Sequence, residues 1–227
     1  MKKVAIFDID GTIFRSSLLI ELTEALVEEG IFPSTAKGVY LKSYKNWFDR
    51  KGTYEKYIGA VIEAFDKNIR GVRHNDFLRV ARKVISFQCN RTYRYTRYLI
   101  KKLRKENYYL FAISNSPLEI VEEFCKKLGF NKVYGRIYEV DSGGKFTGAI
   151  LYKDLISDKA KILKRAIEKE KLTLKQSVGV GDSESDIPFL EMVEEAICFN
   201  PNKRLYQHAK RADWEVIVER KDVVYHL

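Results

Sequence analysis

The chain has 227 residues, 45% of them hydrophobic, and a formal net charge of +10, which predicts a folded protein with one substantial core rather than a disordered chain. No apolar run approaches the length of a transmembrane helix, the three cysteines are widely separated, and only a short apolar run follows Lys2 and Lys3. We therefore expect a cytoplasmic protein without a membrane span, a disulfide scaffold or a signal peptide.

The first predicted strand ends on a pair of acids. The apolar run 4–7 leads into Asp8, and Asp10, Gly11 and Thr12 follow. Because side chains alternate along a strand, Asp8 and Asp10 project to the same side at its C-terminal end, where parallel sheets bind ligands. Such a pair suits a hard cation such as Mg²⁺, with one carboxylate to attack phosphorus and the other to move protons. The ordinary alternative is an acidic turn that ends a buried strand.

A helical region follows the acids. Apolar residues at helical spacing predict four helices, at 18–27, 40–48, 57–65 and 77–87. Ser34 and Thr53 are the expected N-caps of the second and third of these helices. Glycines mark the breaks between them.

Strands and helices alternate through the rest of the chain. The predicted order is a strand at 108–113, a helix at 117–128, a strand at 133–140 with a hairpin partner at 145–150, a helix from 158, a strand at 177–180, a short helix, and strands at 196–199 and 215–218. This alternation predicts an α/β fold with a doubly wound, mostly parallel, Rossmann-like sheet.

Polar residues cluster after two of the later strands. The second predicted strand ends at Ser114 and Asn115, and the strand at 177–180 is followed by Asp182 and Asp186. Lys159 stands near the start of the helix before it. Each has an ordinary explanation, as an N-cap, a solvated lysine or a capped helix start. Their joint order with the first acids favours one shared site.

These residues supply the parts of a phosphoryl-transfer site. The transferred group carries negative charge on its oxygens, so catalysis consists mostly of positioning and neutralisation. Lys159 and a metal ion can supply positive charge, and Ser114 with the N–H groups after it can donate to phosphate oxygens at a helix start. Asp182 can complete the metal's ligand set, and Asp186 can hold Lys159 or a metal-bound water.

The four segments, in this order, resemble the haloacid dehalogenase superfamily of aspartyl-phosphate phosphatases. The spacing from Lys159 to Asp182 and the string GDSESDIPFLEMVEEAICFNP are similar to its phosphoserine-phosphatase-like branch. The resemblance implies a Mg²⁺-dependent phosphoric monoester hydrolase with a helical cap between its first and second motifs. The implied domains are a catalytic core of residues 1–15 and 97–227 and a helical cap domain of residues 16–96.

The resemblance also implies a role for each site residue. Asp8 is then the nucleophile that becomes an aspartyl phosphate, and Asp10 protonates the leaving group and later serves as base for the attacking water. The implied phosphate-binding positions are Gly11, Thr12, Ser114, Asn115 and Lys159. The implied metal ligands are the side chains of Asp8 and Asp182 and the backbone carbonyl of Asp10, with Asp186 in support.

One departure from the phosphoserine phosphatases bears on the substrate. Those enzymes carry a glutamate, which meets the substrate ammonium, at the position that Ser17 fills here. The signature SNSP and the tail NPNKRLYQHAKRADWEV look more like other hydrolases of the same branch. Fold analogy does not choose among alcohol, sugar, nucleotide and lipid phosphates. We expect a small phosphorylated metabolite.

The excess positive charge lies in the expected cap. Residues 34–97 hold 15 Lys and Arg against 5 Asp and Glu, and the remaining residues hold 26 of each. The same segment is rich in aromatic rings, including Tyr40, Tyr44, Trp47, Phe48, Tyr54, Tyr57, Tyr93 and Tyr95.

Three interpretations of this composition remain open. The rings can pack the cap helices while the basic residues are solvated. Basic residues can instead recognise a second anionic group on a small substrate, the candidates being Lys42, Lys45, Arg50, Lys51, Arg91, Arg94 and Arg97. In the third interpretation the cap binds nucleic acid or anionic lipid. This gives the alternative function, a polyanion-binding protein whose phosphatase site is secondary or acts on that partner.

Overall fold

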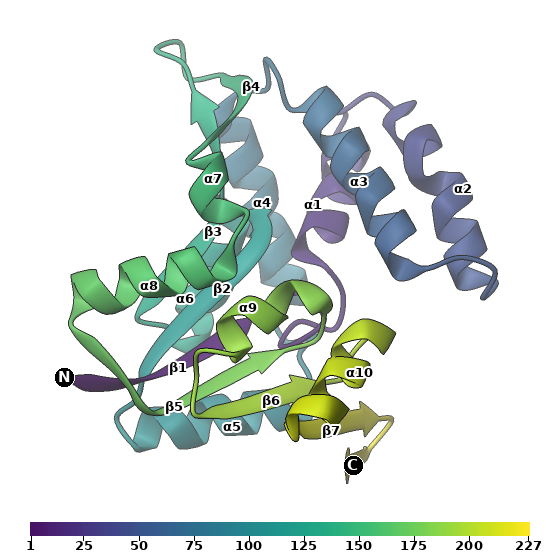
Figure 1. The fold of residues 1–227 in the computed structure, drawn as a ribbon. Coiled ribbons are helices and arrows are strands. Elements are labelled where there is room, and N and C mark those ends of the chain that lie inside the picture. The colour runs from purple at the N-terminus through teal and green to yellow at the C-terminus, as the bar shows by residue number, and fades with distance from the viewer.

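The computed structural model describes residues 1–227 and is built on an eight-stranded sheet with the order β4-β3-β2-β1-β5-β6-β7-β8 (Figure 1). The central strand β1 (Lys2–Asp8) is flanked in parallel by β2 (Tyr109–Pro117) and β5 (Leu172–Gly181). The other parallel strands are β3 (Lys132–Val140), β6 (Glu195–Phe199) and β7 (Glu215–Arg220). The two edge strands, β4 (Phe146–Leu151) and β8 (Val223–His226), are antiparallel. The predicted doubly wound, mostly parallel α/β fold is confirmed.

The segment 4–7 of strand β1 is apolar because both of its faces are buried. Ala5 and Phe7 belong to the larger hydrophobic core, which the sheet shares with the helices between β1 and β3. Val4 and Ile6 point the other way, into a smaller core with the helices of the C-terminal half. Burial on both faces requires a continuous apolar run, and this run carries Asp8 to the end of the strand.

Five helices separate β1 from β2. They are α1 (Leu18–Glu28), α2 (Ala36–Phe48), α3 (Tyr54–Asn68), α4 (His74–Gln88) and α5 (Arg94–Lys105). The predicted N-cap Thr53 is confirmed, because its side chain accepts a hydrogen bond from the Lys56 N–H at 3.3 Å. The prediction for Ser34 is wrong, since α2 begins after Thr35 without a side-chain cap. Pro33 starts a turn there, in which the Ala36 N–H donates to the Pro33 carbonyl.

The four helices α1–α4 divide into two layers. Helices α1 and α4 pack near α6 (Leu118–Leu128), which lies on the sheet, whereas α2 and α3 form a helical hairpin that stands away from the sheet (Figure 1). The chain leaves and re-enters the sheet at one place, where Phe14 and Thr92 pair and the Arg15 N–H donates to the Arg91 carbonyl at 2.9 Å. A second contact joins α3 to the sheet, because the Tyr138 hydroxyl of β3 donates to Asp66 Oδ1 of α3 at 2.7 Å.

The C-terminal half completes the smaller core. Its helices are α7 (Lys153–Ile156), α8 (Lys159–Glu170), a 3₁₀ turn at Glu184–Asp186, α9 (Ile187–Leu190) and α10 (Lys203–Ala212). The sequence prediction omitted α5, α7 and α10, and it was wrong to make 215–218 the closing strand, because β8 pairs with β7 beyond it. None of the helices combines the length and the apolar character needed to span a membrane.

Candidate active site

Asp8 lies at the centre of the site, at the carboxyl end of β1 and paired in register with Ile113 of β2. Its side chain is buried. The Thr12 hydroxyl donates to Asp8 Oδ2 at 3.1 Å and lies 3.4 Å from Asp182 Oδ1. The Thr12 side chain therefore connects the carboxylates of Asp8 and Asp182, at the ends of β1 and β5, and does not face open space.

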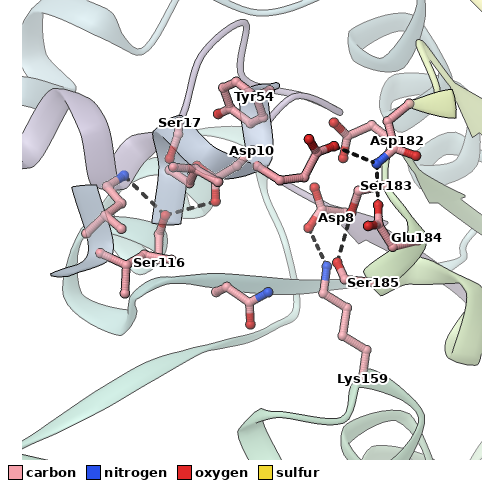
Figure 2. A pocket seen from close by; sticks show the side chains of 16 residues that line it. Asp8, Asp10, Ser17, Tyr54, Ser116, Lys159, Asp182, Ser183, Glu184 and Ser185 are labelled. Carbon is pink, nitrogen blue, oxygen red and sulfur yellow. Dashed lines mark hydrogen bonds and ion pairs between the residues drawn. The ribbon is translucent and has the colours of Figure 1, made fainter. Parts of the chain in front are cut away.

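Lys159 meets Asp8 from the first turn of α8. The helix begins there because the Asp158 side chain accepts hydrogen bonds from the N–H groups of Ala160 and Lys161. The Lys159 side chain is 4% exposed, and its Nζ lies 2.6 Å from Asp8 Oδ1 (Figure 2). It also forms an ion pair with Asp186.

Asp186 is fully buried and has a partner for each of its oxygens. Oδ1 meets Lys159, and Oδ2 accepts hydrogen bonds from the N–H groups of Asp182 and Ser183, both at 3.0 Å. Gly181 allows this approach, because a Cβ atom there would lie only 2.5 Å from the Asp186 Cβ. Asp186 therefore positions both Lys159 and the loop that carries Asp182.

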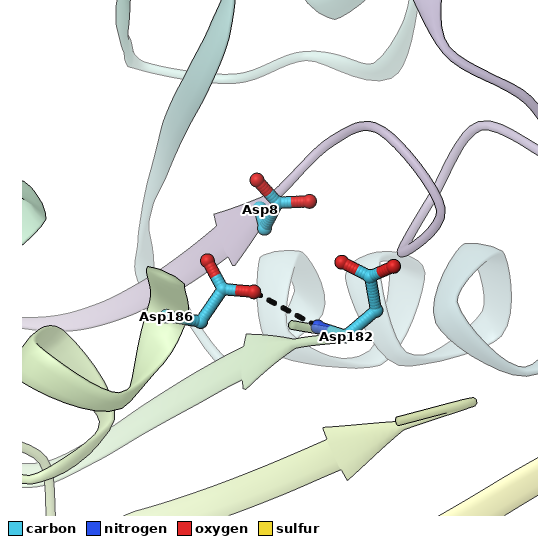
Figure 3. Close-up of side chains that lie close together, drawn as sticks. All are labelled: Asp8, Asp182 and Asp186. Atoms are coloured by element: carbon cyan, nitrogen blue, oxygen red, sulfur yellow. Dashed lines mark hydrogen bonds between the residues drawn. The ribbon is translucent and has the colours of Figure 1, made fainter. Parts of the chain in front are cut away.

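Asp8, Asp182 and Asp186 form an acidic cluster in which one carboxylate oxygen from each residue lies within 4.8 Å of the others (Figure 3). Gly11 packs against it with a positive φ of 80°, and a Cβ at Gly11 would lie 2.3 Å from Asp182 Oδ2. Only glycine fits this position.

The cluster holds more negative charge than one lysine can balance. Burial raises the pKa of Asp8 to about 7, although the Lys159 ammonium opposes the shift and the Asp186 charge adds to it. Burial and the charge of Asp8 also raise the pKa of Asp182. Burial disfavours the charged form of Lys159, but the carboxylates of Asp186 and Asp8 outweigh it and raise the pKa of this ammonium. Hard divalent cations prefer carboxylate oxygens as ligands. A buried cluster of carboxylates with too little positive charge beside it therefore suits such a cation.

Asp10 faces the neighbouring strand instead of this cluster. Its Oδ2 accepts hydrogen bonds from the hydroxyls of Ser114 at 2.7 Å and Ser116 at 2.9 Å, and its Oδ1 accepts from the Leu18 N–H. The Ser116 hydroxyl in turn accepts from the Leu19 N–H at 3.2 Å. Asp10 thus connects the end of β2 to the first turn of α1.

The structure divides the predicted phosphate-binding positions into two groups. Asn115 and Lys159 line the cavity beside Asp8, as does Ser116, which the sequence analysis missed. The Ser114 side chain is buried against Asp10, and the N–H groups of Gly11 and Thr12 donate to carbonyls within their own loop. The alternation of side chains along β2 explains why Ser114 and Ser116 both reach Asp10, because residues two apart share a face.

A cavity of about 320 Å³ lies above the acids, and Figure 2 shows Tyr54 of α3 on its far side from Lys159. Its residues from the core and α1 are Asp8, Asp10, Ser17, Leu19, Asn115, Ser116, Lys159, Asp182, Ser183, Glu184, Ser185 and Asn202. Its residues from α3 are Tyr54, Glu55, Ile58 and Ile62. This stripe was not predicted, although the spacing of four residues between Tyr54, Ile58 and Ile62 in the sequence indicated one helix face.

The basic candidates of the cap do not line this cavity. Arg50 and Arg91 line a second, larger cavity beside it, and Arg91 is paired with Glu21 at 2.7 Å. Arg94 instead donates to the Asp222 carbonyl near β8. The remaining candidates line neither cavity: Lys42, Lys45, Lys51 and Arg97.

Comparison with curated proteins finds a full-length relative. Histidinol-phosphatase from Neisseria meningitidis is 24% identical over 226 residues, which cover 96% of this chain and 99% of that protein. A phosphoserine phosphatase from Mycobacterium tuberculosis is 29% identical over 110 residues, 47% of this chain and 35% of that longer protein.

Comparison with solved structures agrees on the fold. A protein of unknown function from Bordetella pertussis has a TM-score of 0.74 at 16% identity, covering 95% of this chain and 98% of its own. A phosphoserine phosphatase captured as a phospho-aspartyl intermediate analogue has a TM-score of 0.62 at 20% identity, with coverage of 97% and 95%. The haloacid dehalogenase-like hydrolase family matches residues 5–191. This chain therefore belongs to the haloacid dehalogenase-like hydrolases, as its motifs predicted.

Proposed function

We propose that this hydrolase is a Mg²⁺-dependent phosphomonoesterase that works through an aspartyl phosphate on Asp8. The observation that carries the proposal is the buried Lys159, held between Asp8 and Asp186 beside Asp182 at the floor of the cavity. This arrangement offers a carboxylate nucleophile and positive charge at one point, as phosphoryl transfer requires.

The reaction proceeds in two displacements. A carboxylate oxygen of Asp8 attacks phosphorus, the bond from phosphorus to the ester oxygen breaks, and Asp10 gives its proton to the departing alcohol. A water molecule then attacks the phosphorus of the aspartyl phosphate and gives a proton to Asp10. The bond from phosphorus to Asp8 breaks, and inorganic phosphate leaves.

The Lys159 ammonium neutralises the phosphoryl oxygens during both displacements, and the ion pair with Asp186 keeps this ammonium in place. Asn115 lines the cavity and can donate a hydrogen bond to the same oxygens. The hydroxyls of Ser114 and Ser116 hold the Asp10 carboxylate in one orientation. Ser114 is buried beneath the cavity. Its hydroxyl can therefore donate to the phosphoryl group only if its hydrogen bond to Asp10 is replaced by one to a substrate oxygen.

The acidic cluster fits a divalent cation. The side chains of Asp8 and Asp182 and the backbone carbonyl of Asp10 would hold Mg²⁺, which would supply the positive charge that Lys159 alone does not. The Thr12 hydroxyl, in contact with both carboxylates, keeps them at a common position.

Residues 16–96 act as a cap over this site, and residues 1–15 and 97–227 form the core. The backbone pairing of Phe14 with Thr92 supports this division, because the inserted segment begins and ends at that point. The substrate is a small phosphorylated metabolite, and the names of the relatives make histidinol phosphate and phosphoserine the first compounds to test.

An activity screen across phosphorylated metabolites with Mg²⁺ tests the proposal. We expect release of inorganic phosphate and a phosphorylated protein that hydroxylamine cleaves, as it does acyl phosphates. The Asp8→Asn variant should give neither. Turnover by this variant at the wild-type rate would contradict the assignment of the nucleophile.

A further inference from the structure

The active-site cavity continues into a second cavity of about 1050 Å³. Tyr54, Asp182 and Asn202 line both cavities. Three shared residues make the two spaces adjacent, so a substrate whose phosphate lies at Asp8 can extend its alcohol portion into the second cavity.

One wall of the second cavity is made of aromatic rings from the α2–α3 hairpin: Tyr44, Trp47, Phe48, Tyr54 and Tyr57. Trp47 stacks on Tyr57 with ring centroids 5.5 Å apart and an angle of 18° between the planes. Tyr54 meets Trp47 edge to face at 5.6 Å. We name this set the ring wall.

The ring wall has an inner and an outer layer. Tyr57 is 3% exposed and packs the two helices together. Tyr54 and Phe48 are 36% and 67% exposed, so part of each ring is open to solvent. Exposed rings gathered at the mouth of a catalytic cavity indicate a binding surface, since solvent exposure of large apolar groups is otherwise avoided.

Charge does not decide what the second cavity accepts. Its basic and acidic residues are equal in number: Arg15, Arg50, Arg91, Glu21, Glu24 and Asp182. Arg91 and Glu21 are already paired. A balanced set offers little selection by net charge, whereas the ring wall offers a flat face on which another ring can stack.

We infer that the substrate is the phosphomonoester of an alcohol that carries an aromatic or heteroaromatic ring, and that this ring stacks on Trp47 and Tyr54. The inference rests on the proposed phosphatase function and specifies its substrate class. It differs from recognition of a second anionic group, because the selective contact is a ring face and not a guanidinium.

Two matched esters test the inference. Both 2-phenylethyl phosphate and 2-cyclohexylethyl phosphate are esters of primary alcohols of similar size, but only the first has a flat ring. We expect kcat/KM to be about tenfold higher for the phenyl ester, as stacking of one ring on an aromatic side chain gives. Equal values for the two esters would overturn the inference and leave the phosphatase function standing. Turnover of neither ester, with other phosphomonoesters hydrolysed, would also overturn it.

Variants locate the preference. Trp47→Leu and Tyr54→Leu should each bring the ratio of the two kcat/KM values close to one, and Trp47→Phe should keep most of it. Phe87→Leu is the matched control, because Phe87 is 79% exposed on α4 and lines neither of these cavities. An unchanged ratio in Trp47→Leu and Tyr54→Leu would overturn the inference.

A binding measurement separates the contact from catalysis. Trp47 and Trp214 are the two tryptophans, so Trp214→Phe leaves Trp47 as the single indole fluorophore. In the Asp8→Asn, Trp214→Phe protein, 2-(4-nitrophenyl)ethyl phosphate should quench the Trp47 fluorescence by contact. An equal concentration of 2-cyclohexylethyl phosphate should not displace the nitrophenyl ester and so should not restore the fluorescence. Absence of saturable quenching would contradict stacking on Trp47 whatever the turnover.

Discussion

The floor and the roof of the active-site cleft are built in opposite ways. The floor consists of the buried residues Asp8, Lys159 and Asp186, in which Lys159 pairs with both carboxylates; they lie at the end of β1, the start of α8 and the 3₁₀ turn after β5. The roof consists of side chains of the α2–α3 hairpin: Tyr54, Ile58 and Ile62 line the active-site cavity, and the ring wall lines the adjoining cavity. In the proposed mechanism, reaction and selection are therefore separate: the sheet holds the reacting groups, and the hairpin presents the surface that selects the substrate.

The largest expected effect comes from replacing the proposed nucleophile at the floor of the cleft. Asp8→Asn should reduce turnover to background, because an amide of nearly the same size is a far weaker nucleophile. The fold should remain, since Lys159 keeps Asp186 as its partner. Steady-state kinetics and circular dichroism measure the two effects. A variant with most of the wild-type rate would remove Asp8 from the mechanism.

Chelation should inactivate the site at the floor of the cleft without a mutation. Removal of divalent cations should abolish turnover, and Mg²⁺ should restore it. Ca²⁺ should restore it poorly, because its larger and looser coordination shell misplaces the attacking carboxylate. Mg²⁺ should also raise the Tm of the wild type and not that of Asp182→Asn, by mass action on the folded state. Full activity after exhaustive chelation would contradict metal dependence.

Asp10→Asn should produce a smaller loss, of about 10²-fold or more in kcat, which is the usual contribution of a proton-transferring group. The loss should shrink for 4-nitrophenyl phosphate, whose leaving group departs without protonation. A comparison of this ester with an alkyl phosphate measures the difference. Equal losses for both esters would assign Asp10 to positioning, through its bonds to Ser114 and Ser116.

The smallest effect is expected from the basic surface of the cap. Replacement of Lys42, Lys45 and Lys51 by glutamine should change kcat/KM by less than about twofold at physiological salt, because these side chains line neither cavity and salt screens exposed charges. Kinetics with singly and multiply charged phosphomonoesters at low and high salt provide the measurement. A large loss confined to the multiply charged ester would restore the anion-recognition interpretation of the cap.

The catalytic end of the sheet could be predicted to a large extent from local pattern. Asp8, Ser114 and Asp182 each follow an apolar run, and the carboxyl ends of adjacent parallel strands meet at one edge. The boundaries of α2 and the strand β8 could not be predicted in the same way. Pro33 turns the chain before the helix begins, and β8 exists because β7 offers it an edge, which only the assembled sheet provides.

The sequence by itself determined the family, the fold class and the group of residues at the floor of the site, because strand ends, caps and motif spacing are local properties of the chain. The tertiary structure decided which way Asp10 faces, that Ser116 and not Ser114 lines the cavity, and that Tyr54, Ile58 and Ile62 cover the site while most of the basic residues turn elsewhere. The physical reason is that the sequence lists the residues of every face of a helix. Only the packing of that helix against its neighbours decides which face meets the cavity.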